Sequence, residues 1–253
     1  MTDGPPNTEA SAGAQRKRTL SAITLLGFGS GLPVALSFST LEAWCAVSGL
    51  SLKTIGAIKL VALAYVFKFL WAPLIDRYSL PVLGGRRGWM LWTQLGIVVA
   101  LVLIAGLSPQ TSLPAIALLA IVLATLSATQ DIAVDAYRAD QLLPQDRGLG
   151  AALGVGGYRI AMVVSGGFAL ILAGHYGFRH AYLAMAAFMA IGIVGTLIAP
   201  ERRVAEESAH SLLKAYVEPL REFFARTQAL QWLALILVYK LGNAFALSLS
   251  STF

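Results

Sequence analysis

Two aspartates and an arginine stand at the end of a long apolar stretch, in the segment "SATQDIAVDAYRAD" at residues 127–140. Asp131 and Asp135 are four residues apart, so on a helix both carboxylates lie on one face, with Arg138 following one turn later. A carboxylate at the centre of a bilayer costs about 2.5–3.5 kcal/mol on insertion scales, so lipid-facing acids are rare. We therefore expect the pair to face a protein-lined interior, where neighbouring acids can take up a proton on one side and release it on the other.

Two roles fit this aspartate pair. Either carboxylate carries a proton across the membrane, or Asp135 forms a fixed ion pair with Arg138 or Arg159. Glu42, late in the first apolar stretch, is a further candidate for proton coupling, although solvation at the membrane surface explains its position equally well.

Other polar side chains within apolar stretches are candidates for binding a polar substrate. Lysine and arginine would bind its anionic groups, although long lysine side chains can equally snorkel to the membrane surface. Amide and tyrosine side chains offer hydrogen-bond donors and acceptors. The candidates for substrate binding are Gln130, Tyr158, Arg159, Lys59, Lys68, Lys240 and Asn243.

The amino-acid composition indicates that these residues belong to a membrane protein. Hydrophobic residues make up 57% of the 253 residues and charged residues only 13%, whereas a soluble domain has about 25% charged residues. The mean hydropathy is +0.70. The net charge of +6 is therefore interpreted as a topology signal, and no nucleic-acid partner is expected. The single cysteine, Cys45, excludes an intramolecular disulfide and a multi-cysteine metal site, and without a nucleotide or haem motif we expect no metal and no cofactor.

Hydrophobic runs of about 20 residues predict six complete membrane-spanning helices and the beginning of a seventh. The complete spans are predicted at residues 20–47, 52–75, 88–107, 113–138, 148–174 and 180–199. The predicted fold is an all-α membrane protein, in which a disordered cytoplasmic tail at 1–19 precedes a six-helix bundle at 20–200. An amphipathic cytoplasmic linker is predicted at 201–228, and 229–253 would form the incomplete first helix of a second half.

Basic residues in the loops predict how the chain is oriented in the membrane. Loops on one side hold thirteen lysines and arginines, whereas the opposite loops hold only Lys53 and Arg179. Because cytoplasmic loops carry the excess of positive charge, the N-terminus and the 201–228 linker are expected to be cytoplasmic.

The loop between the second and third predicted spans has a distinctive order of charges. The segment "WAPLIDRYSLPVLGGRRGW" at 71–89 places an acid and an arginine at one helix end and a Gly-Arg-Arg run at the start of the next helix. It resembles the cytoplasmic loop signature of the major facilitator superfamily, which implies that these residues pair with neighbouring helix ends and latch one conformation. The residues that would take this gating role are Asp76, Arg77, Arg86 and Arg87. The alternative is that the three arginines are only topology signals.

Further segments are similar to the AmpG-type permeases within that superfamily. They are "LLGFGSGLPVALSFSTLEAW" at 25–44, "SLKTIGAIKLVALAYVFKFLWAPLIDRY" at 51–78, "SATQDIAVDAYRAD" at 127–140, "GYRIAMVVSGGFALILA" at 157–173 and "VYKLGNAFALSLSSTF" at 238–253. The resemblance implies a carrier of the bacterial inner membrane that imports anhydromuropeptides, the products of cell-wall recycling, together with protons. It also implies a missing C-terminal six-helix half as a partner.

Glycines in the predicted spans indicate close helix packing, with helix flexing for alternating access as the alternative. The segment "GFGSGLP" at 27–33 combines glycines with a proline, so the first helix is expected to bend there. The residues assigned to packing or flexing are Gly29, Gly31, Pro33, Gly154, Gly157, Gly166 and Gly167.

Three other functions compete with muropeptide import. Membrane phosphatidyl-group transferases use aspartates at this spacing, but they need an earlier Asp-x-x-Asp-Gly-x-x-Ala-Arg run that this chain lacks, so no enzyme activity is expected. A carrier of the same class could take acetyl-CoA-like or iron-chelate compounds. A half-length chain could also be an inactive half-transporter.

Overall fold

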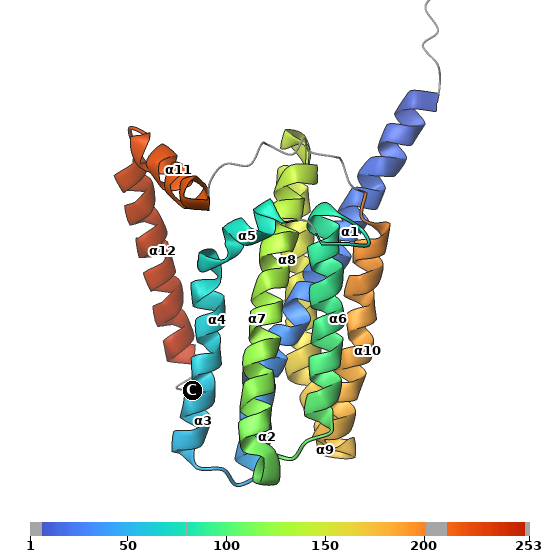
Figure 1. Ribbon diagram of the computed structural model, residues 1–253, viewed down its shortest axis with the longest axis vertical. Coiled ribbons are helices and arrows are strands. Elements are labelled where there is room, and N and C mark those ends of the chain that lie inside the picture. Colours follow the sequence, from blue (N-terminus) through green and yellow to red (C-terminus); the bar gives the residue numbers. More distant parts are fainter. Residues whose placement is uncertain (1–6, 79, 201–211, 251–253) are drawn as a thin grey trace, which may run out of the picture. The chain divides into compact units, whose positions relative to one another are not determined.

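The computed structural model describes residues 7–78, 80–200 and 212–250, and this part of the chain contains helices and no strands. The chain divides into two compact units, Met1–Ala205 and Glu206–Phe253, and each is treated by itself. The long helices of the first unit are α1 (Asn7–Ser37), α6 (Gly85–Ala105), α7 (Pro109–Gln141), α8 (Arg147–Val163) and α10 (Phe178–Ile198) (Figure 1). The shorter elements are α2 (Ser39–Val47), α3 (Leu52–Ile58), η1 (Lys59–Ala62), α4 (Leu63–Val66), η2 (Phe67–Leu70), α5 (Ala72–Arg77), η3 (Pro144–Asp146), η4 (Val164–Phe168) and α9 (Ala169–Tyr176).

Five helical stretches within the described residues are long and apolar enough to cross a membrane. They are Gly13–Val47, Gly85–Ala105, Pro109–Gln141, Pro144–Tyr176 and Phe178–Ile198. These stretches correspond to the first, third, fourth, fifth and sixth predicted spans. The predicted all-α membrane fold is therefore confirmed.

The predicted second span at 52–75 is not one continuous helix. The chain runs along the bundle here as the short segments α3, η1, α4, η2 and α5 (Figure 1). Pro73 lacks the N–H that would bond the carbonyl of Phe69, which favours an interruption here, and α5 begins with this proline in its first turn. Of the six complete spans expected, five correspond to long apolar helical stretches of the described chain, and the one at 52–75 is divided into short helices.

The first span breaks later than its proline suggests. α1 continues through Pro33 to Ser37, and Phe38 leaves the helical conformation with φ −122° and ψ −97° before α2 begins. The Ser37 hydroxyl donates to the Pro33 carbonyl at 2.9 Å, a back-bond that competes with the helix ladder and bends helices. The helix therefore ends at a break at Phe38, and a bend within 27–33 stays a prediction.

The N-terminal segment also differs from the expectation of a disordered tail at 1–19. Residues 1–6 lie outside the described part of the chain, but α1 begins at Asn7. Alanine, glutamine, lysine and arginine, which fill much of this stretch, are good helix formers. In addition, Arg16 binds Asp146, which ties this part of the helix to the bundle.

α1 occupies the centre of the first unit. It packs against α7, α8 and α10, and α6 packs against both α7 and α10 (Figure 1). The fully buried core between these helices includes Leu32 and Leu36 of α1, Ile97 of α6, Leu123 of α7 and Met185 of α10. This arrangement places the polar residues of α7 beside α1 on one side and beside the broken second span on the other.

Glycines bring the backbones of α1 and α8 into contact. A Cβ atom on Gly31 would collide with the carbonyl oxygen of Tyr158, and one on Gly157 would collide with that of Thr24. These two glycines therefore serve close packing, the first of the two roles assigned to them.

Two further glycine contacts hold α1 in place. A Cβ atom on Gly29 would lie 2.9 Å from the Cα atom of Gly192 in α10, and one on Gly27 would collide with the carbonyl oxygen of Gly154 in α8. The sequence did not suggest Gly192, and it included Gly27 only as part of a glycine-rich segment, because only the fold shows which glycines face a neighbouring backbone.

The fifth span contains a π-helical turn, η4. A Cβ atom on Gly166 would be 3.6 Å from the Cβ atom of Ala35, whereas one on Gly167 would have nothing within 4 Å. The Thr40 hydroxyl donates to the carbonyl of Ser165 in this turn at 2.8 Å. The irregular turn therefore lies next to the break between α1 and α2.

The second unit consists of α11 (Leu212–Ala225) and α12 (Ala229–Ser250), which contact each other. α11 falls within the linker expected at 201–228, whose first residues, 201–211, lie outside the described chain. Arg226 binds Glu222 one turn earlier at 3.0 Å. α12 matches the expected helix at 229–253 as far as Ser250.

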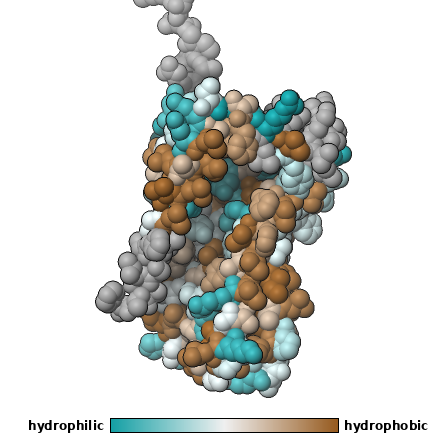
Figure 2. All heavy atoms as spheres, turned by 90° about the vertical axis from the view of Figure 1, so that its left-hand side faces the viewer, coloured by the Kyte–Doolittle hydropathy of each residue, from teal (hydrophilic) through white to brown (hydrophobic). Residues whose placement is uncertain are grey.

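Apolar side chains form several patches on the face drawn in Figure 2, with hydrophilic side chains between them. Large exposed hydrophobic residues of the first unit include Val99, Leu103, Leu118, Ile160 and Ile171. So many large exposed apolar side chains suit contact with lipid or with other membrane helices.

Candidate functional site

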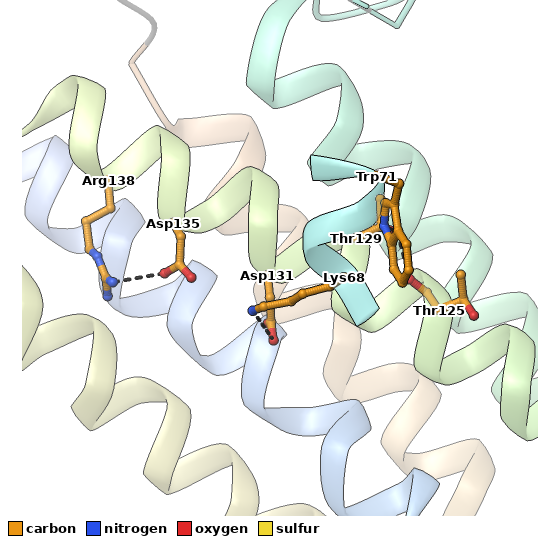
Figure 3. A network of polar contacts seen from close by, with 7 residues as sticks. All are labelled: Lys68, Trp71, Thr125, Thr129, Asp131, Asp135 and Arg138. Atoms are coloured by element: carbon orange, nitrogen blue, oxygen red, sulfur yellow. Dashed lines mark hydrogen bonds and ion pairs between the residues drawn. The ribbon is translucent and has the colours of Figure 1, made fainter. Parts of the chain in front are cut away.

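Asp131 of α7 lies between helices of the bundle and faces the broken second span (Figure 3). Its side chain is 14% exposed, and its Oδ2 atom is 3.9 Å from Nζ of Lys68 in η2. Both aspartates were expected to face a protein-lined interior; Asp131 lies between helices, whereas the side chain of Asp135 is 57% exposed. The lysine partner comes from a segment 63 residues away in sequence, so spacing could not identify it.

A second contact fixes the position of Lys68 relative to α7. Nε1 of Trp71 donates to the Thr129 hydroxyl at 3.0 Å, and that hydroxyl donates to the carbonyl of Thr125 at 2.7 Å (Figure 3). The backbone N–H of Trp71 also bonds the carbonyl of Lys68. The Trp71–Thr129 bond therefore keeps Lys68 beside Asp131 independently of the ion pair.

Asp135, one turn further along α7, has a different partner. Its Oδ1 atom accepts a hydrogen bond from Nη2 of Arg138 at 2.9 Å, and its side chain is 57% exposed (Figure 3). Of the two partners considered from sequence, the structure selects Arg138. Arg159 is exposed, and its Nη1 atom is 4.0 Å from Sδ of Met162.

Hydroxyl groups from three other elements complete the surroundings of Asp131. Tyr65 of α4 and Tyr158 of α8 lie near enough to feel its charge, and the hydroxyl of Ser30 in α1 faces it. Tyr158 is half-buried, so the structure brings this candidate close to the carboxylate. The group combines one acid, one cation and three neutral hydroxyls, and its members lie on five elements.

Gln130 points in another direction from its neighbour Asp131. It is fully buried, and neither its Oε1 nor its Nε2 atom has a hydrogen-bond partner within the described residues. A Cβ atom on Gly29 would lie 3.2 Å from its Nε2 atom, so the amide faces the crowded contact with α1. We therefore separate Gln130 from the residues that line the space around Asp131.

Two polar residues beside Gln130 were not foreseen. The hydroxyl of Thr196 in α10 donates to Oε1 of Gln94 in α6 at 2.8 Å, and both side chains are fully buried. A glutamine inside the apolar run of the third predicted span was a usable signal, because a buried amide in a membrane helix needs a partner on another helix.

Glu42 and Lys59 form a separate ion pair near the loop between α2 and α3, at the other end of the bundle from α5 (Figure 1). Their Oε2 and Nζ atoms are 3.7 Å apart, and the lysine side chain is 66% exposed. The structure therefore does not bring Glu42 together with the two aspartates that share its expected role.

The gating candidates form a network at the end of the bundle that holds α5. Arg86 binds Asp76, and its Nε atom is 3.4 Å from Oδ2 of Asp140. Arg77 lies 5.9 Å from the centre of the Tyr78 ring and takes no part in these two ion pairs. An acid from α5 and an acid from α7 thus share one arginine of α6.

Arg87 contacts the end of a helix instead of an acid. Its Nε and Nη2 atoms each donate at 3.2 Å, to the carbonyls of Thr196 and Leu197 in the last turn of α10. Cations are favourable at this position because the carbonyl end of a helix carries partial negative charge. The predicted pairing with a neighbouring helix end holds for this residue.

Residues that the sequence did not suggest strengthen the same end of the bundle. Nε of Arg18 donates to the carbonyl of Ile198 at 2.6 Å, and the hydroxyl of Tyr137 donates to that of Pro200 at 2.8 Å. Arg16 makes hydrogen bonds of 2.7–3.1 Å to both carboxylate oxygens of Asp146. The basic run before the first span was interpreted only as a topology signal, although these arginines also bind helix ends.

The last two candidates for substrate binding belong to the second unit. Lys240 is exposed on α12. Asn243 lies on the same helix, and its side chain is outside the described part of the chain. Neither residue is placed relative to Asp131.

An apolar groove of about 720 Å³ lies between the broken second span and α7. Its walls are mainly aliphatic, and Trp71, Thr54 and Thr125 supply its polar atoms. Trp71 therefore borders this groove while its indole N–H holds η2 against α7.

The fold and the charged residues within it define a multi-pass membrane protein with ion pairs between its spans. The Major Facilitator Superfamily matches residues 19–253, and the chain belongs to this family.

Three curated relatives show where in the family the chain lies. It is 51% identical over 235 residues to the anhydromuropeptide permease of Escherichia coli strain K12, covering 92% of this chain and 48% of the permease. It is 40% identical over 243 residues to an uncharacterised protein of Haemophilus influenzae, with 94% and 57% coverage. It is 32% identical over 244 residues to the AmpG 4 protein of Rickettsia felis, with 92% and 59% coverage. The chain thus spans about half the length of the curated relatives it matches.

Proposed function

We propose that this chain is part of a proton-coupled carrier that imports anhydromuropeptides from the periplasm to the cytoplasm. The carrier would lie in the bacterial inner membrane with its N-terminus in the cytoplasm, and it would work by alternating access. The observation that carries the proposal is the position of Asp131, a carboxylate that faces Lys68 between membrane-spanning elements, in a chain 51% identical to an anhydromuropeptide permease. A second six-helix unit would complete the path.

Asp131 is the residue proposed to carry the proton. An acid that is 14% exposed can hold a proton on one side of the membrane and lose it on the other as access to water changes. Asp135 is the weaker candidate, because it is more exposed and already accepts a hydrogen bond from Arg138. Glu42 is a separate group near the opposite end of the bundle.

The arginine network at the cytoplasmic end is proposed as the gate. Arg86 bridges acids of α5 and α7, and Arg87 holds the last turn of α10. Breaking these bonds would let the helix ends separate and open the path to the cytoplasm. The same contacts, when formed, would keep that end closed.

An uptake assay tests the proposal. Cells that lack their own anhydromuropeptide permease receive residues 1–253, either alone or together with the part of the E. coli permease that follows the matched region. We expect uptake of radiolabelled anhydromuropeptide in at least one arm, and we expect it to fall when a protonophore removes the proton gradient. No uptake in either arm, with both proteins present in the membrane, would contradict the proposal. Uptake that a protonophore leaves unchanged would remove proton coupling.

A further inference from the structure

The ion pair between Lys68 and Asp131 is loose. At 3.9 Å its two atoms are too far apart for a hydrogen bond, and Nζ of Lys68 makes no hydrogen bond within the described residues. By comparison, Asp135 and Arg138 are 2.9 Å apart and hydrogen-bonded. A charge pair withdrawn from water is stable only when hydrogen bonds satisfy its remaining donors and acceptors. The ammonium of Lys68 therefore has free donors for another anion.

The position of Lys68 does not depend on this ion pair. The Trp71–Thr129 hydrogen bond holds η2 against α7 at 3.0 Å, two residues from Asp131. The lysine side chain is 35% exposed, so an anion can reach it from the open side. If Asp131 lost its charge, the ammonium would stay in place and need a new counter-ion.

Among the groups of the described chain that face Asp131, Lys68 is the only cation. The other titratable groups around it are Asp135 on its own helix, Tyr65 of α4 and Tyr158 of α8, and the Ser30 hydroxyl of α1 also faces it. The tyrosine and serine hydroxyls are neutral. Lys68 therefore has a counter-ion within the protein only when Asp131 is ionised.

We propose that Lys68 binds a carboxylate of the transported molecule and that Asp131 controls its availability through a proton. This inference rests on the proposed function and names the group that couples proton to cargo. When Asp131 takes up a proton on the periplasmic side, its carboxyl becomes neutral, the ammonium keeps its own proton, and the cargo carboxylate becomes the counter-ion. When Asp131 releases its proton to the cytoplasm, the carboxylate competes for Lys68 and the cargo leaves. Proton and cargo then move in the same direction.

Binding measurements on the purified chain test this exchange. The probes are a radiolabelled anhydromuropeptide with free peptide carboxylates and a derivative in which those carboxylates are amidated. We expect the wild type to bind the free acid more weakly as the pH rises, because ionised Asp131 then holds Lys68. The affinity of Asp131→Asn for the free acid should change less than twofold over the same pH range. Lys68→Gln should lose about tenfold or more in affinity for the free acid and keep its affinity for the amide.

Two further variants separate a binding role from a structural one. Lys68→Arg should restore much of the binding of the free acid, because it keeps the cation. Lys53→Gln removes an exposed positive charge from α3 and should bind both probes like the wild type. A Lys68→Gln protein that distinguishes free acid and amide as the wild type does would overturn the inference.

The failure of this inference can be told apart from the failure of the proposed function. If the wild type neither binds nor imports the anhydromuropeptide, the proposed function fails. If the wild type imports it but Asp131→Asn keeps the pH dependence, or Asp135→Asn abolishes it instead, only the exchange between Lys68 and Asp131 fails.

Discussion

At the scale of single residues, the acids of the described spans each lie beside a cation, but the origin of the partner differs. Asp135 pairs with Arg138 on the same helix, a partner that helical spacing can suggest. Asp131 pairs with Lys68 from another segment, and no spacing rule connects two residues so far apart in sequence. The local pair is hydrogen-bonded and the distant pair is not. For this reason we assign the proton-dependent exchange of partners to Lys68 and Asp131.

The buried contact between Thr196 and Gln94 gives a prediction at this scale. Thr196→Val removes the donor at 2.8 Å from the glutamine Oε1 atom and leaves a buried amide oxygen unpaired. Hydrogen bonds between membrane helices contribute about 0.6–1.7 kcal/mol, so we expect a small but measurable loss of thermal stability in detergent.

Thr125→Val is the matched control for that substitution. The Thr125 hydroxyl bonds a carbonyl of its own helix and is exposed, so its loss should leave the melting temperature nearly unchanged. Equal melting temperatures for the two variants would show that the Thr196–Gln94 bond does not stabilise the bundle.

At the scale of secondary-structure elements, helix packing depends on which glycines face a neighbour. Gly156 and Gly157 are adjacent on α8, but only a Cβ atom on Gly157 would meet the backbone of α1. The sequence indicates that glycines are numerous here, whereas the rotation of each helix decides which of them are needed. The fold likewise decides where the first and second spans are interrupted, at Phe38 and along 59–71.

These adjacent glycines form a matched pair for mutagenesis. Gly157→Ala should lower the stability of the chain by about 1–3 kcal/mol, because its Cβ atom would push α1 and α8 apart. Gly156→Ala should be neutral or stabilising by up to about 1 kcal/mol, because alanine favours the helix and the space is open. Thermal unfolding of the two variants in detergent measures the difference. A loss from Gly156→Ala as large as that from Gly157→Ala would contradict close packing as the reason.

At the scale of the whole molecule, charge distribution and fold point to the same orientation. The arginines that bind the helix ends near α5 and α10 belong to the loops with the larger positive charge. Lys53 and Arg179 belong to the opposite loops. We expect the arginine-rich end to face the cytoplasm because basic loops remain on that side.

Cysteine labelling tests this orientation in intact cells. The background variant is Cys45→Ala, which removes the buried natural cysteine. Lys53→Cys should react with a membrane-impermeant maleimide added outside the inner membrane, and Arg147→Cys should react only after the cells are permeabilised. Both positions are exposed, so burial does not explain a difference. Labelling of Arg147→Cys in sealed cells would reverse the proposed topology.

The amino-acid sequence by itself determined the membrane class, the helical architecture and the placement of most spans, because these follow from long apolar runs and the distribution of charge. It also identified Asp131 as an acid that lipid would not tolerate. Only the tertiary structure decided that Lys68 is its partner, that the second span is broken and that Gly27 and Gly192 lie at helix contacts. These features depend on the packing of segments distant in sequence, and on the rotation of each helix against its neighbours, which local composition and spacing do not encode.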